Sequence, residues 1–391
     1  MWSTPGYGRV TMHTVESHEH QMMRAAVRDI VRPFGHAYFT DVVGREVPPT
    51  ELWDALAAHG YMGVSVPEAY GGGGLGLTEL AIVEEELSAA GCPLLTMLVS
   101  PAIVGTVLAR HGTPEQRERW LPSIASGAER FAFAITEPDA GSNSHRIATR
   151  ARRTGTGFVL SGTKTYISAV EDSGAMLVVA SSPDTGGLSL FMVDTDAPGL
   201  ERQRIPTAVR VPEHQWTLYF DEVEVAADRL VGGEGQGLSA VFDGLNPERI
   251  MAAAICTGIG QYALTKAAAY ANERAVWGGR PIGTHQGIAH PLAEAKIGLE
   301  AARLMGQRAA ALHDAHAPAG EAANMAKFLA AEAGIRCLDQ AIQTHGGNGL
   351  ADEYGLADLW FAVRALRTAP VSREMILNYV AQHSLGLPKS Y

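Results

Sequence analysis

The first third of the chain carries apolar residues at a helical spacing. Residues 18–34, 50–63 and 76–91 each repeat apolar side chains three and four positions apart, which predicts amphipathic helices. Thr78 is a candidate N-cap for the third of these runs, and Gly91 follows its end. The glycines of "EAYGGGGLG" before it are typical of a connector, because no strand-loop-helix unit with Lys-Ser/Thr surrounds them. We therefore expect an N-terminal helical domain over residues 1–130.

The pattern changes to short alternating runs near residue 131. "FVLSGTKTYIS", "AMLVVASS", "LSLFMVDTD" and "WTLYFDEVEV" are rich in β-branched and aromatic residues and are separated by Gly, Pro and Asp. "FAFAITEPDAGSN" (131–143) ends one such strand and enters a loop. The runs predict a middle, mainly antiparallel β-domain over residues 131–240.

Helical spacing returns after residue 240. Asn246 is a candidate N-cap, Pro247 suits the first helical position, and Glu248 falls in the first turn of a long Ala-rich helix. Further helices are expected over 286–313, 318–345, 352–367 and 371–384. Their small residues permit close packing, which predicts a C-terminal four-helix-type bundle over residues 241–391. The fold class is accordingly α+β, with a helical, a β and a second helical domain.

Composition narrows the function classes. The net charge of −11 over 391 residues argues against a nucleic-acid-binding protein. Cys92, Cys256 and Cys337 lie far apart, so we expect no metal site and reduced, buried thiols. The first 14 residues are polar and lack a signal core, so we expect a loose arm there, and no apolar run reaches the ~18 residues that span a bilayer. We expect a soluble cytoplasmic protein that binds no membrane.

Several motifs, in order along the chain, resemble the acyl-CoA dehydrogenase family of flavoproteins. "TEPDAGS" is similar to the family's TEPxAGS segment, and "GTKTYIS" (162–168) to its GxKxWIT segment. "ERAVWGGRPIGTHQ" (273–286) resembles RxxFGxxIxxxQ, and "QTHGGNG" (343–349) matches QxxGGxG. "VPEAYGGGGLG" and "EEELSAAG" resemble the N-terminal domain. The resemblance covers nearly the whole chain from about residue 15.

The resemblance implies an FAD between the β-domain and the bundle. Residues from Phe133 to Ser142 would lie along the isoalloxazine, with Thr136 as a polar partner of the ring and Ser142 also facing the CoA. The other cofactor contacts that it implies are Tyr166, Ile167, Ser168, Arg274, His285, Gln286, Gln343, Gly346, Gly347 and Ser372. Arg274, His285 and Gln286 would reach the FAD of a neighbouring subunit, which implies a homotetramer, a dimer of dimers. An electron-transfer flavoprotein is the electron acceptor that the family implies.

The implied reaction is α,β-dehydrogenation of an acyl-CoA thioester to the 2-enoyl-CoA. A carboxylate takes the Cα proton, flavin N5 accepts a hydride from Cβ, and hydrogen-bond donors polarise the thioester oxygen. In many family members the base is the Glu of "YEGT", but Pro370-Val371-Ser372 occupies that position here. Glu374 comes four residues too late and suits an ordinary early-turn acid.

Glu248 is the candidate base that remains. "PERIMAAA" resembles the helix start that carries the base in the isovaleryl- and long-chain-acyl-CoA dehydrogenases, with Arg249 as a neighbouring charge in the substrate site. The competing interpretation is a simple helix-start acid. A helix N-terminus would lower the pKa of Glu248, whereas burial against flavin and acyl chain would raise it.

Pro370 leaves a second question. Proline has no N–H, so a gapless alignment removes one donor to the thioester oxygen. Either Val371 donates instead, or another group substitutes, or the reaction differs. The altered space near Pro370 suits a branched or bulky acyl group by analogy. The alternatives are a flavin monooxygenase or oxidase on the same fold, and a catalytically reduced subunit of a hetero-oligomer.

Overall fold

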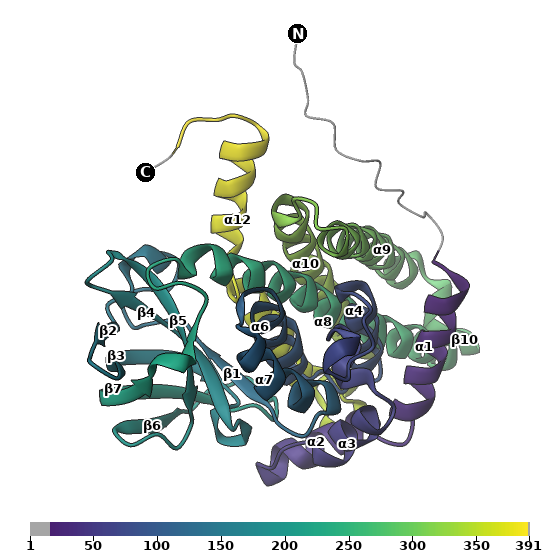
Figure 1. The fold of residues 1–391 in the computed structure, drawn as a ribbon. Coiled ribbons are helices and arrows are strands. Elements are labelled where there is room, and N and C mark those ends of the chain that lie inside the picture. Colours follow the sequence, from purple (N-terminus) through teal and green to yellow (C-terminus); the bar gives the residue numbers. More distant parts are fainter. Residues whose placement is uncertain (1–15, 390–391) are drawn as a thin grey trace.

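Helices, then strands, then long helices follow one another along the chain, as the hydrophobic pattern predicts (Figure 1). This computed structural model describes residues 16–389, so the expected polar N-terminal arm lies outside the described residues. The α+β fold class is confirmed. The domain boundaries at residues 130 and 240 stay predictions.

Short helices form the N-terminal region. A π-helical segment, Leu98–Gly105, contains Pro101 and packs against α8 and β1. The helices are α1 (His18–Val31), α2 (Gly35–Arg45), α3 (Thr50–Ala58), α4 (Leu77–Ala89), α5 (Leu95–Met97), α6 (Thr106–His111) and α7 (Pro114–Ser126). The expected cap at Thr78 is wrong, because Thr78 lies inside α4. The carboxylate of Asp314 caps α4 instead, accepting bonds from the backbone N–H groups of Leu77 (2.7 Å) and Thr78 (2.9 Å).

The middle region is a mostly antiparallel sheet with strand order β6-β7-β3-β2-β4-β5-β8, and β1 pairs in parallel with β4. A register shift between Lys164 and Ile167 bends β3 within "GTKTYIS", where Tyr166 adopts a positive φ of 56°. The strands are β1 (Phe131–Ala134), β2 (Arg150–Arg153), β3 (Gly157–Ser168), β4 (Ala175–Ser182), β5 (Gly187–Asp194), β6 (Leu200–Ile205), β7 (Gln215–Ala226) and β8 (Leu230–Val231).

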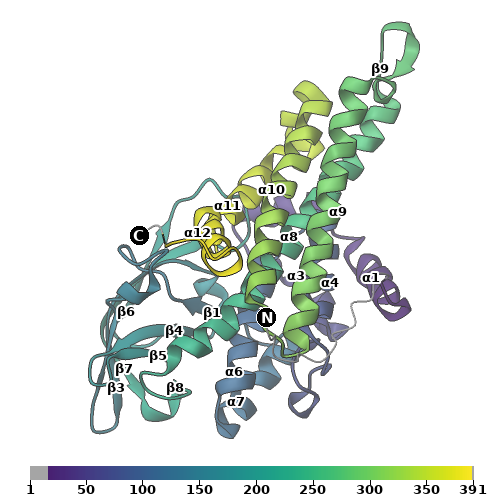
Figure 2. The same cartoon turned by 90° about the horizontal axis from the view of Figure 1, so that it is seen from above.

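Long helices form the C-terminal bundle, in which α8 packs against α10, α9 and α4. In Figure 2 a small hairpin, β9–β10, stands at the end of the bundle that points away from the sheet. The elements are α8 (Gly237–Glu273), β9 (Ala275–Val276), β10 (Arg280–Pro281), α9 (Gln286–Asp314), α10 (Gly320–His345), α11 (Trp360–Thr368) and α12 (Arg373–Tyr379). The helix expected over 352–367 is shorter, because short 3-10 turns precede Trp360. The one expected over 371–384 ends in a π-helical turn, Val380–Ser384.

The predicted start of α8 is wrong. The helix begins at Gly237, so Asn246 is no N-cap and Pro247 lies inside the helix. Tertiary packing explains the earlier start, because Gly244 lies so close to Ile103 and Val107 that an added Cβ would lie 3.0 Å from each. Glu248 is therefore a mid-helix residue, without the exposed N–H groups that a helix start offers to a carboxylate.

Two apolar cores hold the fold together. One runs through the N-terminal helices and the bundle, and the other lies within the sheet. The three cysteines are free and buried, as the sequence predicts. Among residues 16–389, no helix is both long enough and apolar enough to cross a bilayer.

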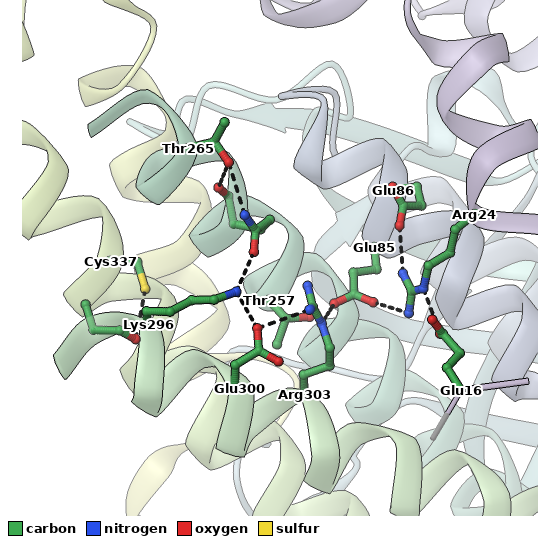
Figure 3. Close-up of polar contacts among 12 residues, drawn as sticks. Glu16, Arg24, Glu85, Glu86, Thr257, Thr265, Lys296, Glu300, Arg303 and Cys337 are labelled. Atoms are coloured by element: carbon green, nitrogen blue, oxygen red, sulfur yellow. Dashed lines mark hydrogen bonds and ion pairs between the residues drawn. The ribbon is translucent and has the colours of Figure 1, made fainter. Parts of the chain in front are cut away.

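A chain of buried charges joins the N-terminal helices to the bundle (Figure 3). Arg24 of α1 pairs with Glu85 (2.7 Å) and Glu86 (2.8 Å) of α4, and Arg303 of α9 donates to Glu85 (2.5 Å). Burial would raise the pKa of Glu85, but the guanidinium groups of Arg24 and Arg303 hold it below its usual value. The network fixes α1 and α4 against α9.

Candidate active site

Glu248 is a half-buried residue of α8. It lies between half-buried Asn246 and buried Ile250. Its carboxylate makes no hydrogen bond or ion pair within residues 16–389, although part of the side chain remains accessible. Burial raises the pKa of Glu248 to about 7, against the opposing charges of Arg249 and Lys327. A carboxylate with free acceptor capacity and a pKa near neutrality has the properties of a general base.

Arg249 follows Glu248 and lies almost entirely inside the protein, 9% exposed. One of its terminal nitrogens donates to the Asn246 side chain over 2.8 Å, while its Nε is buried without a partner among the described residues. Asn246, predicted as a cap, thus orients Arg249 instead. The guanidinium keeps donor capacity beside Glu248, as a substrate contact requires.

The other end of the predicted site, Pro370-Val371-Ser372, links α11 to α12. The Ser372 hydroxyl accepts the Met375 N–H over 3.3 Å and caps α12. The Glu374 side chain is 73% exposed and faces Arg373 at 3.9 Å. An exposed acid at a helix start fits the structural role expected for Glu374, whereas Glu248 is half-buried.

The two flavin segments of the sheet lie side by side. The Thr136 carbonyl accepts the Thr165 N–H over 2.9 Å, which places "TEPDAGS" against "GTKTYIS". Lys164 and Glu137 pair at 2.9 Å in the interior, and Lys164 also donates to the Ile135 carbonyl (2.9 Å). Neither Lys164 nor Glu137 was singled out from the sequence. The available signal was the single Lys in the strand run FVLSGTKTYIS, since a lysine buried in a sheet requires a partner.

The predicted residues of these segments differ in exposure. Tyr166 is 63% exposed and Ser142 is exposed, whereas Phe133 and Ile167 are buried, the latter in the core of the sheet. Ile167 can therefore offer its backbone, not its side chain, to a cofactor. The Ser168 hydroxyl is engaged with the Gln215 amide at 2.8 Å.

The far end of the bundle contains a cavity of about 350 Å³ that brings four predicted cofactor residues together. Arg274, Gln343, Gly346 and Gly347 line it, with Tyr270, Val276, Ile282, Thr344, His345 and Asn348. The ring of Tyr270 stacks on that of His345 at 4.2 Å, which stiffens one wall. Tyr270, His345 and Asn348 were not predicted.

His285 and Gln286 lie beside this cavity, exposed at the start of α9. The His285 N–H donates to the Ile282 carbonyl, and the Ile282 N–H donates to the Arg274 carbonyl. The cavity is far from Glu248, because Tyr270 lies 22 residues further along α8, or ~33 Å at 1.5 Å per residue. One chain therefore does not bring both groups of predicted cofactor residues to one place (Figure 2).

The residues present fit FAD. A Cβ added at Gly346 or Gly347 would meet nothing within 4 Å, and the same holds for Gly141 of "TEPDAGS". These open glycines let a ligand approach the backbone, and the Arg274 guanidinium suits a pyrophosphate. Within residues 16–389, no group of three or more His, Cys, Asp or Glu side chains could hold a metal ion.

Comparison with known proteins covers all three regions. The family models for the N-terminal, middle and C-terminal domains of acyl-CoA dehydrogenase match residues 17–128, 132–223 and 235–385. The chain is 51% identical to the acyl-CoA dehydrogenase FadE12 of Mycobacterium tuberculosis over 384 residues, which is 96% of this chain and 98% of the relative.

Solved structures of the same family superpose on this chain. A glutaryl-coenzyme A dehydrogenase in complex with glutaryl-CoA superposes with a TM-score of 0.92 at 27% identity, over 97% of this chain and 98% of the other. A glutaryl-CoA dehydrogenase of Mycobacterium smegmatis in complex with FADH2 gives 0.89 at 25% identity, over 96% of each chain. The chain therefore belongs to the acyl-CoA dehydrogenase family and is an FAD-dependent oxidoreductase.

Proposed function

We propose that the chain converts an acyl-CoA thioester to its 2-enoyl-CoA with Glu248 as the general base. The observation that carries the proposal is the Glu248 carboxylate itself, desolvated yet without a hydrogen-bond partner among the described residues. A carboxylate in that state can accept the Cα proton of a substrate held beside it. FAD, when bound, supplies the acceptor for the electron pair and hydrogen that leave Cβ.

Phe133, Thr136, Ser142, Tyr166, Ile167, Ser168 and Ser372 are proposed to hold the flavin end of that FAD. Ser142 and Arg249 are proposed to contact the substrate. Arg274, His285, Gln286, Gln343, Gly346 and Gly347 are proposed to bind the FAD of a neighbouring subunit.

The thioester oxygen still needs a donor, since Pro370 has no N–H. We propose the Val371 N–H, which donates to no described residue. A Val371→Pro variant should lose about 10²–10³ in kcat, whereas Val371→Ala should keep it. Equal rates in the two variants would remove Val371 from this role.

A homotetramer, a dimer of dimers, is the proposed assembly. Its support is the separation of the bundle-end cavity from the flavin segments of the same chain, together with Trp277, which is 94% exposed on the β9–β10 hairpin. Light scattering should give the mass of four identical chains. Co-purification of a related chain would point to a hetero-oligomer instead. An electron-transfer flavoprotein is the proposed acceptor, and the cytoplasmic location stays a prediction.

Anaerobic titration of the purified flavoprotein with a panel of acyl-CoAs tests the base. The wild type should bleach, and Glu248→Gln should bleach at least ~10²-fold more slowly. Glu374→Gln is the matched control, because that acid is exposed. Equal bleaching of wild type and Glu248→Gln would reject Glu248. Reduced enzyme that reacts rapidly with oxygen would favour the monooxygenase or oxidase alternative.

A further inference from the structure

A buried lysine on α10 binds the linker between α11 and α12. Lys327 is 1% exposed, and its Nζ donates to the carbonyl oxygens of Arg367 (3.1 Å) and Val371 (2.5 Å). These carbonyls belong to the end of α11 and to the linker that replaces "YEGT". Its charge also acts on Glu248 of α8. Lys327 is thus the one side chain named so far that interacts with both candidate positions.

We propose that Lys327 is a positioning residue for the reaction: its ammonium holds the linker 369–372 against α10 and, together with Arg249, contributes positive charge near the Glu248 carboxylate. The proposal rests on the proposed function of Glu248 as base. Lys327 itself need not touch substrate or cofactor. It acts through the backbone of Val371 and through the field at Glu248.

A second contact from α10 fixes the same linker. Glu332 accepts from the Nε of Arg367 (2.8 Å) and from the Nε of Arg373 (2.9 Å). The Arg373 guanidinium also lies 5.2 Å from the ring centre of Phe328. Side chains of α10 therefore bind both ends of the linker. Among Lys327, Phe328 and Glu332, only Lys327 is buried, and it binds a backbone carbonyl of the linker.

The charged groups around the pair come from two helices. The charges of Arg249 of α8 and Lys327 of α10 act on Glu248, and Lys327 is in turn influenced by Cys256 and Arg249 of α8 and by Glu332 of α10. Burial lowers the pKa of Lys327 to about 8, so it still carries its charge at pH 7. A nearby positive charge favours the ionised form of a carboxyl. Loss of the Lys327 charge should therefore raise the pKa of Glu248.

A purely structural lysine would behave differently. Its removal would destabilise the fold without moving the titration of the base. The test is the pH profile of kcat/KM for the FAD-loaded enzyme with an acyl-CoA that saturates it. The profile is measured for wild type, Lys327→Met, Lys327→Gln and Lys327→Arg. The acidic limb should move upward by about one unit in the two neutral variants and stay in place in Lys327→Arg. Lys296→Met, at an exposed position, is the control that should match wild type.

Hydrogen exchange gives a readout apart from activity. Amides of the linker should exchange faster in the neutral variants than in wild type and Lys296→Met. If one neutral variant fails to fold, the other and Lys327→Arg still decide the result. If a folded neutral variant keeps both the acidic limb of its kcat/KM profile and the amide exchange of its linker unchanged, the proposed role of Lys327 is overturned. Failure of the proposed function is separate, because it would appear as an active Glu248→Gln.

Discussion

Lys164 Nζ lies 2.9 Å from Glu137 Oε1, with both side chains in the interior of the protein. The same carboxylate accepts the backbone N–H groups of Ala148 (2.6 Å) and Thr149 (2.9 Å). One ion pair therefore closes the base of the loop from 137 to 149, which includes Ser142, and ties it to the strand that carries Tyr166. The two segments proposed to hold the flavin are held in one geometry by a pair that is shielded from solvent.

Removal of Lys164 should therefore cost both stability and FAD. A Lys164→Met variant leaves the Glu137 carboxylate buried and unpaired, which typically costs ~3–5 kcal/mol in the free energy of unfolding. Denaturant unfolding and FAD content per chain measure the two effects. Lys296→Met removes an exposed pair with Glu300 and should cost less than ~1 kcal/mol. Similar losses in the two variants would contradict the role of the buried pair.

The order of the elements could be predicted because each region has a strong period, 3.6 in the helices and 2 in the strands. The start of α8 could not. Asn246-Pro247-Glu248 has the composition of a helix N-terminus, and only the packing of Gly244 against Ile103 and Val107 shows that the helix is already under way. Local capping preferences are weaker than the burial of one helix face against another element.

The candidate site, like the fold, was only partly predictable from the sequence. Glu248 could be singled out, because the resemblance gives its position and the sequence shows that "YEGT" is absent. Its surroundings could not, since Lys327 comes from another helix and no local pattern connects the two residues. The sequence left open whether helix start or burial would dominate its pKa. Burial does, because the helix start lies at Gly237.

The rate should rise with pH around neutrality. Glu248 must be ionised to accept a proton, and burial raises its pKa to about 7. The kcat/KM of the enzyme should therefore be low below that pH, increase through it and level off above, reporting the free enzyme. Rates measured from about pH 5.5 to about pH 8.5 with one acyl-CoA bracket this pKa and check the prediction. A residual rate of Glu248→Gln that shows the same limb would assign the titration to another group.

Arg274 should contribute to FAD affinity but not to the fold. It is exposed beside the bundle-end cavity, and a guanidinium-pyrophosphate contact is worth about 1.5–3 kcal/mol. Arg274→Ala should weaken FAD binding by roughly 10- to 100-fold while the thermal midpoint of the apoprotein stays near that of wild type. Arg308→Ala, at another exposed arginine, is the control. Equal FAD affinity in both variants would show that the cavity is not part of a cofactor site.

Asp314 should stabilise α4 from a distance of more than two hundred residues in sequence. Its carboxylate, at the end of α9, accepts from the N–H groups of Leu77 and Thr78 and from the Thr78 hydroxyl (2.6 Å). Asp314→Ala leaves these donors without their acceptor and should lower the free energy of unfolding by about 2 kcal/mol. Asp339→Ala, on an exposed face of α10, is the control and should be nearly neutral.

The contribution of Asp314 should also depend on pH in a defined direction. Burial would raise its pKa, but hydrogen bonds from His313, Thr78 and Leu77 bring it below the ordinary value of 3.8. A group whose pKa is lower in the folded state stabilises the fold above its unfolded pKa, and the effect is lost as pH falls through the folded pKa. The stability difference between wild type and Asp314→Asn should therefore be full at neutral pH and shrink below about pH 4. Urea unfolding at several pH values measures it, and a difference that grows with acidity would mean that the carboxyl is bound in its protonated form.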